Sequence, residues 1–119
     1  MEGFLKKEVL VKRAVFTIST YQSKWCVIND NIFTYYDAFD LEKDQPIGQG
    51  IHINVCGATL QLDQKANRIS IKLPQGGTTF TMKAKKANLN NWRDAFNQAV
   101  KTPEEVEEQR LAEIGRAHV

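Results

Sequence analysis

Hydrophobic and polar residues alternate in short runs through the first two-thirds of the chain. The alternation is clearest in residues 51–55, 69–73 and 80–84, where every second side chain is apolar. Successive side chains of a strand point to opposite faces of a sheet, so this pattern predicts strands with one buried face and one wet face. The expected strands cover residues 3–7, 23–28, 32–37, 50–55, 58–62, 68–73 and 78–84, with a further apolar run at 14–19.

Turn residues separate these runs. Asn29-Asp30-Asn31 and Pro74-Gln75-Gly76-Gly77 contain residues that tolerate left-handed backbone, and both are typical of hairpins. Consecutive hairpins indicate antiparallel neighbours, and turns about every 8 to 12 residues are typical of a compact β-barrel or sandwich.

The hydrophobic period changes near residue 89. Leu89, Trp92, Phe96, Ala99 and Val100 recur at three and four residues, which predicts one amphipathic helix. Its aromatic side chains are too apolar to remain in water, so we expect the helix to cover an open end of the strands.

A second helix is predicted after Lys101. Thr102 is a typical N-cap, Pro103 suits the first helical position, and Glu105 lies three residues after the cap. We expect this helix to reach about Ile114. Residues 1–101 are therefore predicted to form one domain, and 102–119 an acidic helical extension or linker whose last residues resemble an arbitrary end or a vector remnant.

Composition agrees with one intracellular globular domain. Of 119 residues, 42% are hydrophobic and 25% charged, and no apolar run approaches the roughly 18 residues of a membrane span. The first residues lack the layout of a signal peptide, and two cysteines make no disulfide framework. Through Lys101 there are 14 Lys and Arg against nine Asp and Glu, a balance of +5, whereas the remainder carries −3. This basic balance is too weak to indicate a nucleic-acid partner.

The residue types give no sign of catalysis. No nucleophile lies beside a base, no His pairs at a metal-ligand spacing, and the Gly48-Gln49-Gly50 turn precedes a strand instead of a helix. We therefore expect neither enzyme activity nor a metal or cofactor.

Five segments in order resemble the pleckstrin homology (PH) family over most of residues 2–101. They are Glu2 to Lys7 (EGFLKK), Lys24 to Ile28 (KWCVI), Asn31 to Tyr36 (NIFTYY), Pro46-Ile47-Gly48, and the helix tryptophan Trp92. The resemblance implies a mostly β fold: a seven-stranded, antiparallel, partly open barrel capped by a C-terminal helix, with Trp92, Phe96 and Trp25 as structural residues.

The family resemblance also implies a phosphoinositide site at the open barrel end. Lys7, Lys24 and Tyr35 match headgroup-binding positions, whereas Gln22 and Ile47 stand where strong binders have basic residues. We expect the neighbouring basic residues Lys6, Lys12 and Arg13 to face the same anionic membrane. Four such charges (Lys12, Arg13, Lys24 and one of Lys6 and Lys7) at about 1 kcal/mol each give only a roughly millimolar affinity, so stable recruitment needs a second signal.

The region between Lys7 and Lys24 allows two interpretations. Its apolar residues predict either a tall hairpin or a loop that presents Val15 and Phe16 as a membrane-dipping wedge. The acidic run that follows Tyr36, at Asp37, Asp40, Glu42 and Asp44, is expected to be a solubilising loop or the negative end of a charge dipole.

The function favoured by this reading is a membrane-targeting adaptor that is cytoplasmic, peripheral and monomeric. The alternatives are a protein-docking module of the same superfold, which Gln22 and Ile47 favour, and a structural spacer in a larger protein.

Overall fold

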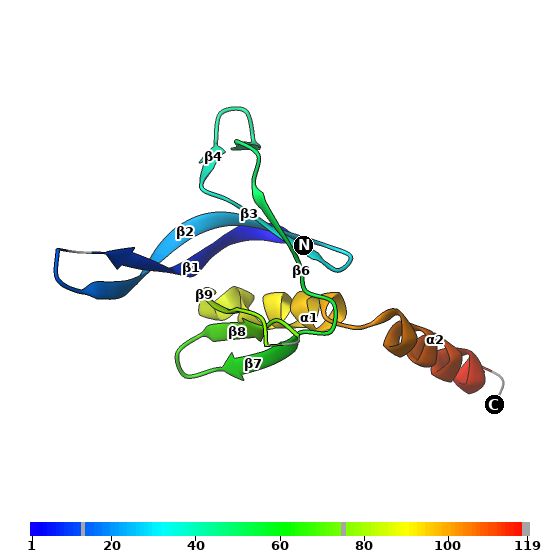
Figure 1. Ribbon diagram of the computed structural model, residues 1–119. Helices are drawn as coiled ribbons and strands as arrows, with labels where there is room; N and C mark the ends of the chain where they lie inside the picture. The colour runs from blue at the N-terminus through cyan, green and yellow to red at the C-terminus, as the bar shows by residue number, and fades with distance from the viewer. Residues whose placement is uncertain (13, 75, 118–119) are drawn as a thin grey trace.

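The computed structural model describes residues 1–12, 14–74 and 76–117. Its strands are β1 (Glu2–Lys12), β2 (Thr17–Asn29), β3 (Ile32–Tyr36), β4 (Ala38–Asp40), β5 (Gln45–Ile47), β6 (Ile51–Asn54), β7 (Thr59–Asp63), β8 (Arg68–Lys72) and β9 (Thr79–Lys83). A 3-10 turn, η1 (Lys86–Asn88), leads into the helices α1 (Leu89–Ala99) and α2 (Pro103–Ala117), as Figure 1 shows.

Seven strands form one antiparallel sheet in the order β6-β3-β2-β1-β9-β8-β7. The order confirms the predicted partly open barrel, because β6 and β7 end the sheet without pairing with each other. Within the described ranges, β1 pairs with β9 at only two positions, Lys6 with Lys83 and Lys7 with Met82. The two strands therefore separate soon after Lys7, which leaves a gap at this end of the barrel.

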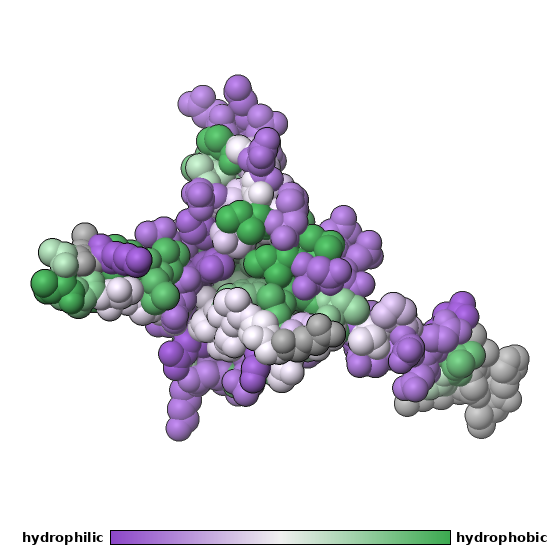
Figure 2. Space-filling view, in the orientation of Figure 1, coloured by the Kyte–Doolittle hydropathy of each residue, from purple (hydrophilic) through white to green (hydrophobic). Residues whose placement is uncertain are grey.

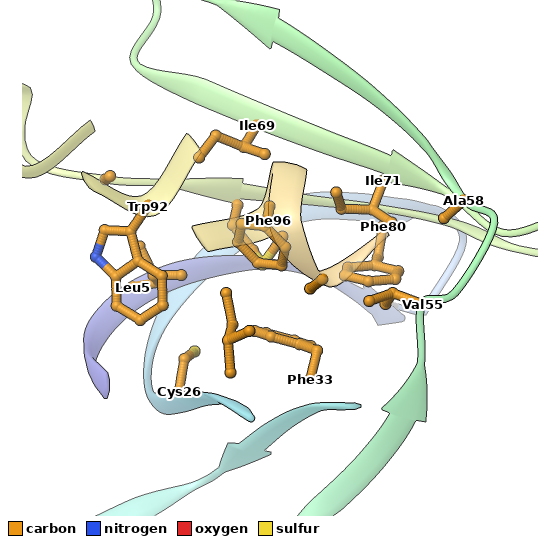
Figure 3. Close-up of a cluster of buried hydrophobic side chains, with 14 of the residues drawn as sticks. Leu5, Cys26, Phe33, Val55, Ala58, Ile69, Ile71, Phe80, Trp92 and Phe96 are labelled. Atoms are coloured by element: carbon orange, nitrogen blue, oxygen red, sulfur yellow. The ribbon is translucent and has the colours of Figure 1, made fainter. Parts of the chain in front are cut away.

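The core lies between the sheet and α1. Leu89, Trp92, Phe96 and Ala99 lie on the buried stripe of the helix, and Trp92 is only 2% exposed. Figure 3 shows Trp92 and Phe96 among side chains from the strands, including Leu5, Phe33 and Phe80. The predicted structural roles of Trp92 and Phe96 agree with this burial.

The approach of Trp92 to β1 accounts for the glycine in the EGFLKK segment. A Cβ added at Gly3 would lie 3.3 Å from Cζ2 of Trp92, which is tighter than ordinary van der Waals contact. The absence of a side chain at Gly3 therefore lets the indole pack against the backbone of β1.

The hairpin of β1 and β2 is tall, as one of the two interpretations predicted. Its register runs from Glu2 opposite Val27 to Lys12 opposite Thr17, and the ribbon projects well beyond the barrel (Figure 1). Val15 and Phe16 lie in the turn of this hairpin.

A two-stranded ribbon formed by β4 and β5 occupies the segment that the sequence predicted to be an acidic loop. Phe39 of β4 stacks on Trp25 of β2, with ring centroids 4.1 Å apart, and Phe4 packs edge-on against Trp25 at 5.0 Å. Trp25 thus has a structural role outside the main core, because it anchors the ribbon to the outer face of the sheet.

The second helix begins as predicted and runs further. The Glu105 N–H donates a hydrogen bond to Oγ1 of Thr102 at 3.3 Å, which confirms the N-cap. The helix extends to Ala117 instead of ending near Ile114. Residues 103–112 are exposed, and no helix in the described ranges is long and apolar enough to cross a bilayer.

Candidate functional site

Lys7, Lys24 and Tyr35 line one cavity at the open end of the barrel. The register places Lys7 opposite Gln22, Leu5 opposite Lys24, and Tyr35 opposite Cys26, so all of these side chains lie on the core face of the sheet. The cavity has a volume of about 400 Å³ and opens where β1 separates from the start of β9, at residues 78–81. The structure thus brings together the three residues that the sequence grouped first.

The ammonium group of Lys7 is partly buried and so partly desolvated. Its Nζ lies 4.9 Å from the centroid of the Tyr35 ring, a cation–π geometry that favours the ammonium form. Burial and, after it, the positive charge of Lys24 lower the pKa of Lys7 below its ordinary value of 10.5. The cavity therefore holds two ammonium groups that repel each other and that an anion would stabilise.

Lys24 already has an anionic partner. Its Nζ lies 2.5 Å from Oδ1 of Asp37, which also lines the cavity. The Lys24 side chain is 12% exposed, whereas that of Asp37 is 78% exposed. An incoming phosphate would therefore have to compete with the Asp37 carboxylate for Lys24.

The other predicted basic residues lie elsewhere. Lys6 points to the opposite face from Lys7 and lines a separate hollow of about 290 Å³ with Lys83 and Lys85. Lys12 lies five residues beyond Lys7, which is roughly 16 Å along the strand, and on the same outer face as Lys6. Lys6 and Lys12 therefore do not line the cavity of Lys7, Lys24 and Tyr35, whereas Arg13 lies outside the described residues.

Gln22 and Ile47 also stay out of the cavity lining. Gln22 is exposed directly opposite Lys7, on the same face of the hairpin. Ile47 is 53% exposed in β5. A basic side chain at position 22 would therefore lie beside Lys7, but the chain has glutamine there.

The turn of the tall hairpin presents apolar side chains to solvent. Val15 is 89% exposed, and Phe16, Leu10 and Ile18 are exposed as well. Figure 2 shows hydrophobic surface at the end of the projecting hairpin. The region is thus a tall hairpin with an apolar tip, and contact of Val15 and Phe16 with a membrane stays a prediction.

The sequence did not assign Asp37 to the cavity. The acidic run that contains it was visible, but the contact with Lys24 spans 13 positions of the chain. The contact depends on the pairing of Trp25 with Tyr36, which sets Asp37 just past the end of β3, beside Lys24. The register of β2 with β3 would have revealed this contact. The alternation of the two strands alone does not fix that register.

Comparison with known proteins identifies the fold. The PH domain of ArhGAP27 is similar to this chain with a TM-score of 0.62 at 13% identity, covering 84% of this chain and 98% of that chain. The C-terminal PH domain of pleckstrin, in complex with D-myo-Ins(1,2,3,4,5)P5, gives 0.58 at 16% identity, covering 84% and 96%. The human PH domain of pleckstrin homology domain-containing protein family A member 5 gives 0.59 at 17%, covering 86% and 78%.

No protein-family model and no curated protein matches the chain in sequence. The structural similarity, together with the sheet order and the capping helix, shows that the chain has the pleckstrin homology fold. The fold expected from the EGFLKK, KWCVI and NIFTYY segments is thereby confirmed.

Proposed function

We propose that the chain is a non-enzymatic targeting module that binds phosphoinositide headgroups on anionic cytoplasmic membranes. The observation that carries this proposal is the pair of lysines, Lys7 and Lys24, converging with Tyr35 on one open cavity. Two ammonium groups in a partly dry site suit phosphate, because charge-assisted hydrogen bonds to its oxygens replace the lost hydration and relieve the repulsion between the lysines.

The ligand class is supported by one of the similar structures. The C-terminal PH domain of pleckstrin holds a multiply phosphorylated inositol. A ligand of that kind carries several phosphates on a small ring, and one molecule could reach both lysines. A single phosphate can engage two ammonium groups only if they lie close to the same oxygen atoms.

The affinity of the site is expected to be low. Only two lysines line the cavity in place of the four basic residues expected from the sequence, so about 2 kcal/mol of attraction to an anionic surface is available from charge. The apolar hairpin tip supplies a second contact, because Val15 and Phe16 can enter the interface between lipid headgroups and acyl chains. Recruitment then depends on the headgroup and the hairpin together.

A vesicle co-sedimentation assay tests the proposal. Wild-type chain should bind vesicles that contain phosphatidylinositol bisphosphate, and binding should fall as salt is raised. Lys24→Ala should weaken binding about fivefold, because one ammonium near an anionic surface contributes about 1 kcal/mol. Lys65→Ala is the matched control, since it removes one lysine from an exposed turn outside the cavity.

The same assay separates the two contacts. Replacing both Val15 and Phe16 by Ser should lower binding to all anionic vesicles while leaving the preference for phosphoinositide unchanged. Equal binding to neutral and phosphoinositide vesicles, or full binding by Lys24→Ala, would remove the proposed headgroup site.

Protein docking is the second candidate, and the engagement of Lys24 by Asp37 favours it, because a satisfied lysine has less need of a phosphate. In this alternative a peptide lies beside α1, where Arg93 pairs with Asp94 at 3.0 Å on the helix surface. Loss of a captured partner in Arg93→Glu, with vesicle binding by the wild type absent, would favour docking over lipid targeting.

A further inference from the structure

The outer part of β1 has one edge without a neighbouring strand. On one side β1 pairs with β2 as far as Lys12, whereas on the other side, within the described ranges, it pairs with β9 only at Lys6 and Lys7. Beyond Lys7 that second side faces the open cavity and then solvent, and Figure 1 shows the hairpin projecting past the other strands. Residues 8–12 therefore form a free edge, whose unpaired backbone N–H and C=O groups can pair with a strand of another chain.

The free edge carries two opposite charges on one face. Glu8 and Lys12 lie on the same face of the hairpin as Leu10, which is 70% exposed. None of the ion pairs formed among the described residues includes Glu8 or Lys12. Glu8 accepts a hydrogen bond from the Tyr21 hydroxyl at 3.3 Å, which holds the carboxylate over the hairpin and leaves it able to accept from a further donor.

The sequence of the free edge, EVLVK, is complementary to itself when two copies run antiparallel. Such copies are related by a two-fold axis through a residue that faces its own counterpart, because paired side chains point to the same face of a sheet. With the axis at Leu10, Glu8 of each copy faces Lys12 of the other. Val9 of each copy then faces Val11. Opposite charges therefore meet twice, and apolar side chains meet apolar side chains.

The neighbouring registers lack this match. An axis at Val9 brings Lys12 beside Lys6, which repels it. An axis at Val11 leaves Lys12 opposite an apolar side chain. The edge of β2 that β3 leaves uncovered, residues 17–23, contains no charged residue to define a register. The charge pattern therefore favours one edge and one register.

We propose that the free edge of β1 is a self-association surface, and that its partner is a second copy of the chain, paired antiparallel about Leu10. The two hairpins then form one four-stranded sheet in the order β2-β1-β1-β2. The second copy lies at the mouth of the lysine cavity, because Glu8 and Leu10 also line that cavity. This dimer replaces the monomer expected from the sequence, and it does not depend on lipid binding, because none of its paired residues is Lys7 or Lys24.

Sedimentation velocity of the full chain without lipid tests the self-association. The wild type should change from monomer to dimer as its concentration rises. Glu8→Lys and Lys12→Glu should each weaken the dimer about tenfold, because two attractive contacts become repulsive. Glu42→Lys and Lys65→Glu make the same charge changes in exposed turns away from the free edge, so they are the matched controls and should dimerise like the wild type.

Charge exchange separates a specific contact from a loss of folding. An equimolar mixture of Glu8→Lys and Lys12→Glu should dimerise as well as the wild type, because positions 8 and 12 are both basic in one copy and both acidic in the other. The double variant Glu8→Lys/Lys12→Glu should dimerise for the same reason. If the mixture stays monomeric while each variant keeps the circular dichroism spectrum of the wild type, the proposed register is wrong.

Disulfide cross-linking locates the two-fold axis. Leu10→Cys in a Cys56→Ser background should form a covalent dimer under air oxidation, because a residue on the axis faces itself within the reach of a disulfide. Cys26 stays in place because it is buried. Ser19→Cys is the control, since Ser19 pairs with Leu10 on β2, one strand further from the axis. Monomer at every concentration, or equal cross-linking of the two cysteine variants, would overturn the pairing about Leu10.

Discussion

The surroundings of Lys7 in the candidate cavity disfavour its ammonium group and so oppose folding. Burial and the charge of Lys24 lower the pKa of its ammonium group, so the protonated form is less favourable in the folded chain than in the unfolded one. The unfolded chain therefore binds more protons between the folded-state pKa and the unfolded value near 10.5. In this window the contribution of Lys7 to stability rises with pH.

Lys7→Met should remove that dependence. We expect the free energy of unfolding of the wild type, minus that of the variant, to increase as pH rises from neutral toward 10.5. Urea unfolding at a series of pH values measures the difference, and Lys6→Met controls for loss of a lysine from the opposite face. If the free energy of unfolding of the wild type, minus that of the variant, falls as pH rises, the surroundings of Lys7 stabilise its ammonium group and the account is contradicted.

Alternation predicts the face of the sheet on which each charged residue of β1 lies, but it does not predict which residue that side chain contacts. Alternation alone places Lys6 and Lys7 on opposite faces of the sheet. It therefore indicates that these two lysines do not line the same cavity. The contact between Lys24 and Asp37 needs the register of β2 with β3, which the sequence leaves open. Asn31 is similar: its side chain donates to the carbonyls of Ala99 and Lys101, a contact across about 70 positions that no local pattern encodes.

Among the elements, α1 was the most predictable and has the largest expected effect on stability. Trp92→Ala removes a side chain that is 2% exposed and leaves a cavity beside Gly3, so we expect a loss of about 3 to 5 kcal/mol. Urea unfolding followed by circular dichroism measures this loss.

The matched control is Leu111→Ala on α2, where the side chain is 57% exposed and the expected change is within about 0.5 kcal/mol. Similar losses in the two variants would mean that α1 does not close the core in the way described above.

The ribbon of β4 and β5 was the element that the sequence missed. Its strands have three residues each and lie in an acidic segment without clear alternation, so no period could reveal them. Tertiary contacts of Phe39 with Trp25 and Phe4 hold the ribbon in position. Strongly patterned elements such as β8, β9 and α1 were predicted because each carries its own buried face.

At the scale of the whole molecule, the barrel and its helix form one unit with two projections near the open end. The hairpin of β1 and β2 and the ribbon of β4 and β5 both project from the barrel (Figure 1). The hairpin carries the apolar tip, and the ribbon and its turn carry Asp40, Glu42 and Asp44. The lysine cavity lies where β1 leaves β9. The proposed membrane targeting combines a weak contact at the lysine cavity with a nonspecific apolar contact, and neither alone is expected to hold the chain on lipid.

The most direct measurement is an NMR titration of the full chain with a soluble inositol bisphosphate. The largest shifts are expected at Lys7, Lys24 and Tyr35, because these residues line the cavity proposed for the headgroup. Shifts concentrated at Lys6, Lys83 and Lys85 in the hollow on the opposite face, or no shifts at millimolar ligand, would contradict a headgroup site between Lys7 and Lys24.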